Sequence, residues 1–470
     1  MTSRIKGATQ EAWAAVGGAP QALERVASGG PGGVLTARLP VIELARATVT
    51  ACSLAAAELA AVRSGGDPPA VRVDDGAVAA AFASERHLTI GGRPGATFAP
   101  LSGFWRAADG WVRTHANYPH HRARLLAALG IPDGDEDKVL ADHLAAVIRD
   151  EAAEHVQEQV YAEGGLAVAV RTPQEWAASE PGRASAAGPL IGVERAAGGA
   201  APVRRLGPLD GGVLLPARGV RVLDLTRVIA GPVATRTLAL LGADVLRVDS
   251  PQLPESADAH ADTGFGKRSC LLDLDVRADR SRFEELLVTA DVVVTGYRPG
   301  ALDRYGLSAG VLLEQRPDLI VAQLCAWGGD GPWAARRGFD SLVQAACGIA
   351  AVEAAPDGWP GALPAQALDH GTGYLIAAAV LRALAERHTA GGGRVLRFSL
   401  AATAAWLVDR IRPEPRIGPL DPYDPHLHLT ETDSALGRLR HALPPVRIDG
   451  GPSDWSRPPG RPGTDEPRWQ

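Results

Sequence analysis

Cysteine is scarce in this sequence of 470 residues. The four cysteines, Cys52, Cys270, Cys325 and Cys347, are far apart and lie in apolar surroundings. The chain has no C-x-x-C pair and no Cys/His spacing of the kind that binds zinc. We therefore expect four buried free thiols and no cysteine-based metal site.

An excess of positive charge is also missing. The chain has 54 Asp and Glu and 48 Lys and Arg, which gives a formal net charge of −6 and a pI near 6.1. Neither this balance nor any basic stripe predicts nucleic-acid binding. No apolar run reaches the roughly twenty residues of a membrane span, and residues 1–18 have no apolar signal core. The sequence predicts no nucleic-acid partner, no membrane partner and a cytoplasmic location.

The glycine motifs that bind dinucleotides and nucleotide phosphates are absent as well. Residues 219–251, GVRVLDLTRVIAGPVATRTLALLGADVLRVDSP, predict a strand, a turn at Gly231 and Pro232, a helix that stops at Gly242, and a second strand. No G-x-G-x-x-G run and no P-loop joins the first strand to the helix. A strand–helix–strand crossover of this length is the unit of a parallel sheet covered by helices. A ligand at the strand ends must therefore be held in another way.

The rest of the C-terminal half continues this alternation of strands and helices. We expect strands at 269–274, 292–295, 319–325 and 395–400, and helices at 280–289, 340–355 and 373–389. The predicted fold class is α/β, a doubly wound, Rossmann-like parallel sheet with a smaller α+β domain.

The N-terminal half shows a weaker version of the same order. Residues 38–83 predict a strand, a small-residue helix, a glycine stop and a second strand, a weak internal repeat of 219–251. Before them, the glycine-rich segment 28–34 predicts a flexible joint. The similarity of 38–83 to 219–251 could also arise by coincidence, because any two strand–helix–strand units look alike.

A small-domain-like segment, 95–195, follows. It predicts a strand pair about 108–110, a helix that stops at Gly130, one amphipathic helix at 135–160, and a Thr-capped helix anchored by Trp176.

Three histidines, His115, His120 and His121, lie close together in this segment. No carboxylate or cysteine shares their spacing, and adjacent histidines in a Tyr-Pro-His-His loop mostly face solvent. We therefore expect no metal at this cluster.

Five blocks of the C-terminal half carry a family resemblance. They are VLDLTRVIAGPVATRTLALLGADVLRVDSP, GKRSCLLDLD, ADVVVTGYRPGALDRYGL, RPDLIVAQLCAWGGDGPWAARRGFDSLVQAACG and ALDHGTGYLIAAAVLRAL. In this order and spacing they resemble the family III CoA-transferases, the CaiB/BaiF-like group that includes formyl-CoA transferase, carnitine CoA-transferase and α-methylacyl-CoA racemase. The resemblance covers 216–405. Over 95–195 a weaker likeness to the family's smaller domain rests on the ADGWV turn and the T-x-x-E-W element.

The resemblance implies that Asp369 is the catalytic aspartate. The preceding PAQAL is strand-like and Gly371 to Gly373 resemble a helix entry, so we expect Asp369 on an exposed turn whose backbone N–H groups keep the carboxylate ionised. Such a nucleophile converts an acyl-CoA into an acyl-aspartyl anhydride and then an aspartyl-CoA thioester. An aspartate that only caps the helix is the alternative. We expect the neighbouring His370 to point elsewhere, without an acid–base role.

Coenzyme A needs cations for its phosphates and a groove for adenine and pantetheine. By match to the family's blocks, the expected CoA-binding residues are Ile229, Ala230, Thr263, Gly264, Phe265, Gly266, Gly296, Tyr297, Arg298, Arg304, Arg337, Gly338, Phe339 and Asp340. Arg304 is the residue most expected on a phosphate, because a guanidinium can bond two oxygens, and a solvated helix charge is its alternative. Lys267 and Arg268 are expected to orient the strand entry. No cofactor beyond CoA as a substrate is expected.

The predicted function is transfer of CoA from an acyl-CoA donor to a carboxylic acid. The racemase branch of the family places a proton-abstracting histidine at the position of Phe339, so phenylalanine favours transfer over racemisation. A non-catalytic CoA-binding partner subunit is a third interpretation.

The order of the parts differs from that of the family, in which the sheet half precedes the small domain. We expect residues 1–195 to form a degenerate first CoA-transferase-like half, 196–218 a linker, 219–410 the intact sheet domain and 411–470 an irregular tail. A homodimer or an internal pseudo-dimer is the expected assembly, with the 90–106 loop as a wall of the acyl pocket.

Overall fold

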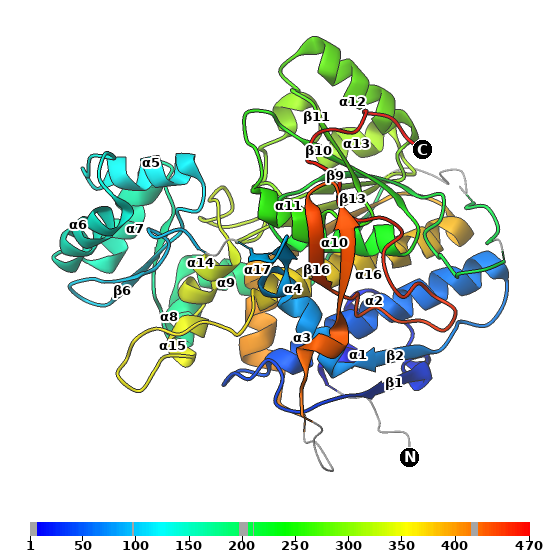
Figure 1. The fold of residues 1–470 in the computed structure, drawn as a ribbon, viewed down its shortest axis with the longest axis horizontal. Coiled ribbons are helices and arrows are strands. Elements are labelled where there is room, and N and C mark those ends of the chain that lie inside the picture. Colours follow the sequence, from blue (N-terminus) through cyan, green and yellow to red (C-terminus); the bar gives the residue numbers. More distant parts are fainter. Residues whose placement is uncertain (1–6, 96–97, 197–204, 210, 415–421) are drawn as a thin grey trace.

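The computed structural model describes residues 7–95, 98–196, 205–209, 211–414 and 422–470. A seven-stranded sheet in the order β11-β10-β9-β12-β13-β14-β8 forms its centre (Figure 1), and every neighbouring pair is parallel except β14 with β8. The strands are β8 (Gly192–Arg195), β9 (Arg221–Leu225), β10 (Asp244–Asp249), β11 (Arg268–Leu271), β12 (Val292–Thr295), β13 (Ile320–Cys325) and β14 (Arg394–Ser399). The expected α/β fold with a parallel sheet is confirmed.

Helices cover both faces of this sheet because its strands are apolar on both sides. Along β9, Val222 belongs to one buried cluster and Leu223 to another. The first cluster includes side chains of α10 (Ala230–Leu240) and α16 (Ala367–Ala390), and the second includes those of α12 (Arg277–Thr289) and α13 (Ala309–Gln315). Strands buried on both faces are typical of parallel sheets.

The N-terminal half packs on this core through α2 (Val41–Ser64), which lies beside α16 in Figure 1. The helices approach closely: a Cβ added to Gly371 of α16 would meet the Leu44 side chain of α2 at 2.7 Å. By length and composition α2 could cross a membrane, but most of it is buried inside the structure. The expectation that no apolar segment reaches that length is therefore wrong.

The expected repeat at 38–83 is placed wrongly. No strand begins it, because α2 starts at Val41, directly after Pro40. The strand that precedes this helix is β1 (Val26–Gly29), which pairs in parallel with β2 (Val71–Asp74) in a separate two-stranded sheet. β1 overlaps the beginning of the segment expected to be a flexible joint.

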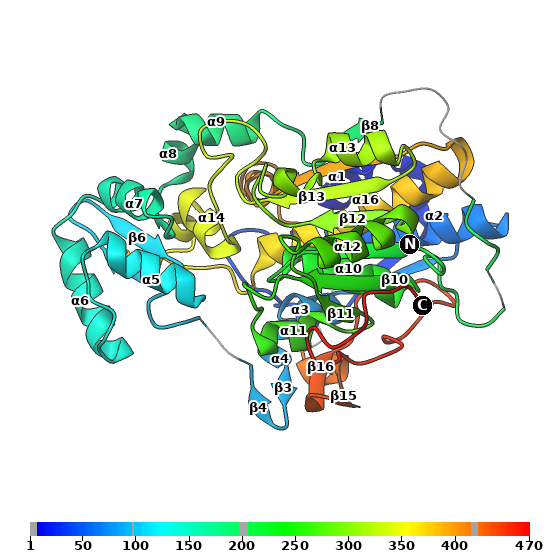
Figure 2. The same cartoon turned by 90° about the horizontal axis from the view of Figure 1, so that it is seen from above.

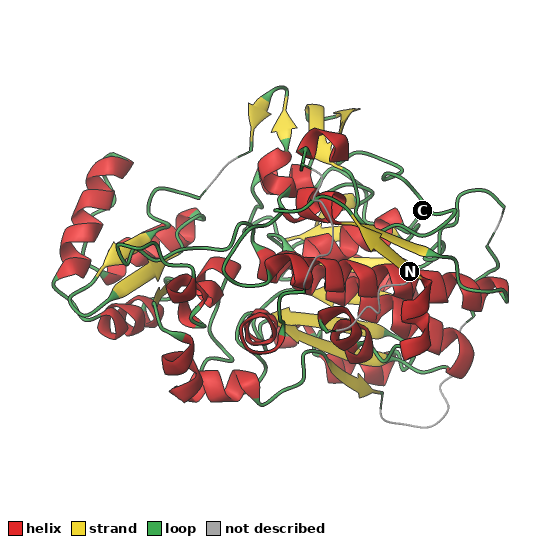
Figure 3. Cartoon of the chain, turned by 90° about the horizontal axis from the view of Figure 1, so that it is seen from below, coloured by secondary structure: helices red, strands yellow, loops and turns green. Residues whose placement is uncertain are grey.

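The small unit forms one end of the molecule (Figure 3) around an antiparallel sheet of three strands. Its elements are β5 (Phe104–Arg106), β6 (Trp111–Thr114), α5 (Pro119–Ala128), α6 (Asp137–Arg149), α7 (Ala153–Ala162), β7 (Ala167–Ala169), α8 (Pro173–Ala178) and α9 (Glu180–Ala186). The strand pair about 108–110 and the Thr172 cap are confirmed. The single helix expected at 135–160 is two, because Asp109 accepts the Ala153 N–H at 2.8 Å and α7 begins there.

The C-terminal segment contains more regular structure than expected. Its hairpin, β15 (Leu429–Ser434) and β16 (Gly437–Ala442), joins β3 (Thr89–Ile90) and β4 (Arg93–Pro94) in a four-stranded antiparallel sheet (Figure 2). The last residues then run along the β11 edge, where the Asp465 carboxylate accepts the Ser269 N–H at 2.8 Å. This hairpin pairs with residues far away in the chain, Leu439 with Ile90 being 349 positions apart, so it leaves little local signal.

The remaining helices connect these parts. They are α1 (Ala8–Ala15), η1 (Pro20–Arg25), α3 (Asp75–Phe82), α4 (Ser84–His87), α11 (Ala257–Thr263), η2 (Asp303–Tyr305), α14 (Asp340–Ala346), α15 (Ile349–Val352), α17 (Leu400–Ala405), η3 (Trp406–Arg410) and η4 (Pro425–His428). α14 and α15 replace the single helix expected at 340–355, with Gly348 in a left-handed conformation (φ 90°) between them. The linker expected at 196–218 lies partly outside the described residues, and 205–209 with 211–218 contain no helix or strand.

Candidate active site

A cleft of about 800 Å³ opens at the carboxyl ends of β9, β10, β12 and β13. Leu225, Asp249, Gly296 and Leu324 line it from the ends of these strands. The chain leaves β9 toward β10 on one side, whereas β12 lies on the other, so the two crossovers diverge here. Open α/β sheets bind their ligands at such a switch point.

Asp369 lies in this cleft, in the first turn of α16, and not on an exposed turn as expected. The helix begins at Ala367, two residues before the aspartate, and Asp369 is only 7% exposed. Its backbone N–H donates a hydrogen bond of 2.9 Å to the Asp340 carboxylate. The strand-like interpretation of PAQAL is wrong because Gln366 is already the residue that precedes the helix.

The surroundings of Asp369 favour its protonated form. Burial raises the pKa of Asp369 well above its ordinary value, and the nearby carboxylates of Asp340 and Glu85 raise it further. Burial also raises the pKa of Asp340 to about 6, although the N–H of Asp369 opposes that shift. The expectation that backbone N–H groups keep the Asp369 carboxylate ionised is therefore wrong.

Six arginines line the cleft: Arg124, Arg227, Arg298, Arg304, Arg336 and Arg337. Three of them have a carboxylate partner, namely Glu255 for Arg227, Asp275 for Arg304 and Glu158 for Arg336. In the described part of the chain, the other three have no ion pair. Burial lowers the pKa of Arg337, and the charges of Arg298 and Arg124 lower it further. Both of these guanidinium groups therefore lie near that of Arg337.

Most of the expected CoA-binding residues come together here. Those in the cleft lining are Ala230, Gly296, Tyr297, Arg298, Arg304, Arg337, Gly338 and Phe339. Arg304 lies at an exposed position, 3.1 Å from Asp275 and with its guanidinium 4.5 Å from the centre of the Tyr305 ring.

Six expected residues are not in the lining: Ile229, Thr263, Gly264, Phe265, Gly266 and Asp340. The C-terminal segment occupies the surroundings of 263–266, since Phe265 packs on Trp455 and the Gly266 N–H donates to the Arg457 carbonyl at 2.9 Å. Asp340 is buried behind the cleft and supports Asp369 from there.

The small unit supplies lining residues that the sequence did not indicate as such: Tyr118, His120, His121 and Arg124. His121 is buried, so its expected exposure to solvent is wrong, and His115 is buried as well. The His115 ring stacks on Phe339 with 3.8 Å between ring centres. Burial lowers the pKa of His115 to about 3 and that of His121 to about 2, so both rings are neutral. The unusual density of aromatic and His residues at 115–121 was the available signal.

The loop 90–106 was expected to form a wall of the acyl pocket, but its described residues lie elsewhere. Its β4 strand pairs with β3, and neither 90–95 nor 98–106 lines the cleft. Residues of the segment 118–124 line the cleft in place of this loop.

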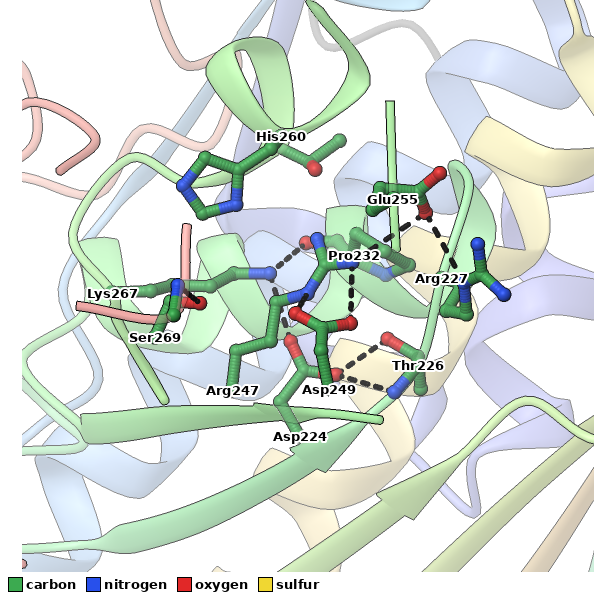
Figure 4. A network of polar contacts seen from close by, with 12 residues as sticks. Asp224, Thr226, Arg227, Pro232, Arg247, Asp249, Glu255, His260, Lys267 and Ser269 are labelled. Atoms are coloured by element: carbon green, nitrogen blue, oxygen red, sulfur yellow. Dashed lines mark hydrogen bonds and ion pairs between the residues drawn. The ribbon is translucent and has the colours of Figure 1, made fainter. Parts of the chain in front are cut away.

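A buried polar network fixes the loop between β9 and α10 (Figure 4). Lys267 donates to the Asp224 carboxylate and to the Pro232 carbonyl, both at 2.9 Å, which fits its expected orienting role. The Glu255 carboxylate accepts the N–H of Val228, a residue in the left-handed region (φ 70°), at 2.9 Å.

The same carboxylate joins this loop to the small unit. The Tyr118 hydroxyl donates to Glu255 at 2.7 Å, while Arg247 lies 2.7 Å from Asp249 and 3.5 Å from Glu255. The strand-end loop and the first residue before α5 are thus held by one buried group.

A second cleft of about 660 Å³ adjoins the first and shares Tyr297, Arg298 and Cys325 with it. Cys325 is partly exposed there, whereas the other three cysteines are buried, and all four are free thiols. Among the described residues, no group of three or more His, Cys, Asp and Glu side chains could hold a metal ion.

Residues 218–415, which contain β9 to α17 and Asp369, match the family model of CoA-transferase family III. The chain carries a CoA-transferase family III domain. This confirms the resemblance inferred from the five sequence blocks.

The chain is also similar to proteins that are already known. The chain is 31% identical over 323 residues to an acetyl-coenzyme A transferase of Hypoxylon pulicicidum, covering 66% of this chain and 54% of the relative. It is 34% identical over 254 residues to a formyl-CoA:oxalate CoA-transferase of Streptomyces coelicolor, with 50% and 62% covered. A crystal structure of a CaiB/BaiF family protein from Brucella suis is 30% identical, with a TM-score of 0.39 and coverage of 41% and 55%. The chain thus spans about half the length of the curated relatives it matches.

Proposed function

We propose that this chain is a CoA-transferase that moves CoA from an acyl-CoA donor to a carboxylic acid through Asp369. One observation carries the proposal: a buried carboxyl group without a cationic partner in the described chain faces a cleft whose walls hold six arginines. The carboxyl suits covalent catalysis, and the arginines suit a ligand with several phosphates. Relatives of this family domain that act on acetyl-CoA, formyl-CoA and oxalate support the same class of reaction.

The reaction follows from one nucleophile used twice. The Asp369 carboxylate attacks the thioester carbonyl of the donor, the C–S bond breaks, and CoA thiolate leaves behind an acyl-aspartyl anhydride. The thiolate then attacks the aspartyl carbonyl, which releases the donor acid and forms an aspartyl-CoA thioester. The acceptor carboxylate repeats these two steps in reverse order, so CoA ends on the acceptor and Asp369 is regenerated.

The unpaired arginines are the proposed anchors of the CoA phosphates. Arg298 and Arg337 were expected in this role, and Arg124 joins them from the small unit. Arg304 already pairs with Asp275 through Nη2, so a phosphate would compete with that carboxylate for its charge. No cofactor beyond CoA is needed for these steps.

Racemisation of an acyl-CoA is the second candidate, and the site disfavours it. Phe339 has no proton to exchange, and burial lowers the pKa of both histidines in the lining, His120 and His121, that of His121 to about 2. A general base works best with a pKa near the operating pH. A non-catalytic CoA-binding subunit is the third candidate.

Two finer features remain part of the proposal. The strand order and the two helical layers support a doubly wound, Rossmann-like sheet. The packing of α2 on α16 supports an internal pseudo-dimer of the two halves, although a homodimer fits the same family. The cytoplasmic location stays a prediction.

Three measurements on the full chain distinguish the candidates. CoA exchange between acyl-CoA and isotopically labelled acids tests transfer, and solvent deuterium at the α-carbon tests racemisation. Titration calorimetry with CoA tests binding alone. Transfer that Asp369→Asn abolishes supports the proposal; CoA binding without transfer to any acid in a broad panel supports the subunit interpretation and contradicts it.

A further inference from the structure

Two polar side-chain contacts of the described residues, Glu85–His370 and Glu58–Arg382, connect the N-terminal half to α16, and they differ in their distance from Asp369. Glu85 of α4 contacts His370, the residue directly after Asp369, with 3.2 Å between Oε2 and Nε2. Glu58 of α2 pairs with Arg382, thirteen positions further along the helix from Asp369. At 1.5 Å per residue, this second pair is roughly 20 Å away along the axis.

His370 is held rigidly by its surroundings. It is fully buried, and its ring stacks on Phe82 of α3 with 5.3 Å between ring centres. Its Nδ1 atom has no hydrogen-bond partner in the described structure, so its side-chain polar contact is the one to Glu85. The ring faces the N-terminal half and not the cleft.

Glu85 is equally well placed, because the residue before it is fixed. The Ser84 hydroxyl donates to Asp262 of α11 at 2.9 Å. Arg236 of α10 donates to both Ser84, at 3.1 Å, and Asp262, at 3.2 Å. The position of α4 is therefore set by two helices of the C-terminal half.

Three carboxyl groups consequently surround the first turn of α16: Asp369 itself, Asp340 from α14 and Glu85 from α4. The charged or titratable neighbours of Glu85 besides Asp369 are His370, Arg86, which is 4.0 Å away, and His87, whose pKa the Glu85 charge raises against the opposite effect of burial. The contact with His370 lowers the pKa of Glu85 despite burial, so Glu85 is ionised at neutral pH.

We infer that Glu85 is a positioning residue for Asp369. Glu85 fixes the first turn of α16 through His370, and it places a negative charge near the Asp369 carboxyl group. This inference rests on the proposed function, in which Asp369 attacks the thioester. It also gives the N-terminal half a role in the chemistry, in addition to covering α16.

The charge has a direct chemical consequence. A nearby negative charge disfavours a second one, so the Glu85 charge helps to keep Asp369 protonated. Asp369 must lose its proton, for example through a rise in pH, before it can act as a nucleophile. Removal of the Glu85 charge should make the carboxylate form available at lower pH.

The test compares Glu85→Gln with Glu58→Gln, a matched variant that also loses an ion pair between the halves. The pH dependence of kcat/KM is measured for both and for wild type. We expect the acid limb to move down by roughly 1 pH unit in Glu85→Gln, the scale on which nearby charges act. Glu58→Gln should keep the wild-type limb, and Glu85→Asp should restore it. An acid limb unchanged in Glu85→Gln overturns the inference.

A second readout does not need turnover. The infrared carbonyl band of protonated Asp369, identified by its loss in Asp369→Asn, is titrated in wild type and in both glutamine variants. A midpoint that falls in Glu85→Gln alone supports the inference, and equal midpoints refute it. If no acid accepts CoA but the midpoint still falls, the proposed function fails and the effect of Glu85 on Asp369 stands. If transfer occurs and the midpoint does not move, only the inference about Glu85 fails.

Discussion

The Asp340 carboxylate accepts the backbone N–H of Asp369 at 2.9 Å, so one buried acid supports the other. The contact fixes the start of α16 and places two like charges close together. Burial and Asp340 raise the pKa of Asp369 above its ordinary range, and burial raises that of Asp340 to about 6. The proposed nucleophile, Asp369, therefore favours its protonated form.

This preference for the protonated form predicts an unusual pH dependence of turnover. Because attack requires the carboxylate, kcat/KM should rise with pH and reach its plateau above the range in which ordinary carboxyl groups titrate. Asp340→Asn removes the neighbouring charge but keeps an oxygen for the Asp369 N–H, so it should move the acid limb to lower pH. A wild-type profile already flat at pH 4–5 would show that Asp369 is ionised in the free enzyme.

The raised pKa of Asp369 also predicts that this residue lowers the free energy of unfolding at neutral and alkaline pH. The folded chain holds a proton on Asp369 that the unfolded chain releases near the ordinary pKa of about 4. Stability therefore falls as pH rises from there through the folded-state pKa. Asn does not titrate, so Asp369→Asn should have a Tm a few degrees above wild type at pH 8. A change of about 1 kcal/mol in the free energy of unfolding shifts Tm by roughly 2–4 °C. The difference should vanish near pH 3; a lower Tm for the variant at pH 8 argues against the raised pKa.

Arginine substitutions should rank the CoA contacts. Arg337→Gln removes an unpaired guanidinium of the cleft and should weaken CoA binding by about 1–3 kcal/mol. Arg304→Ala should cost less, about 0–1 kcal/mol, because Arg304 is exposed and already paired with Asp275. Calorimetry with CoA and with 3′-dephospho-CoA measures both, and Arg25→Gln, which alters an exposed pair outside the cleft, is the control. A larger loss for Arg304→Ala than for Arg337→Gln would reverse this ranking.

A fragment of residues 216–470 should aggregate or lose activity. It lacks α2, whose removal uncovers the buried face of α16, and it lacks the cleft wall at 118–124. Light scattering and the CoA exchange assay measure the two effects. A monomeric, fully active fragment would show that the N-terminal half is an independent appendage.

The sheet was the part most open to prediction from sequence. Its strands are short apolar runs and its helices end at glycines such as Gly242 (φ 98°), so local rules locate β9, α10 and β10 closely. The errors concern contacts between distant segments. The β15–β16 hairpin pairs with β3, and the buried state of His121 depends on contacts such as that with Phe339, 218 positions away.

Asp369, the proposed nucleophile, illustrates the same limit. Family blocks indicate Asp369, but its burial and protonation follow from Asp340 and Glu85, which no local pattern connects to it. Tyr118 and Arg124 were missed for the same reason, since only the placement of the small unit brings them to the cleft.

The most direct test of the account is to trap the covalent intermediate. Wild type and Asp369→Asn are incubated with acyl-CoA, treated with hydroxylamine, digested and examined by peptide mass spectrometry. The account predicts a hydroxamate on Asp369 in wild type and none in the variant, because hydroxylamine opens both the anhydride and the thioester at the aspartyl carbonyl. Transfer of CoA by wild type with Asp369 unmodified, or with the hydroxamate on another carboxyl group, would contradict it.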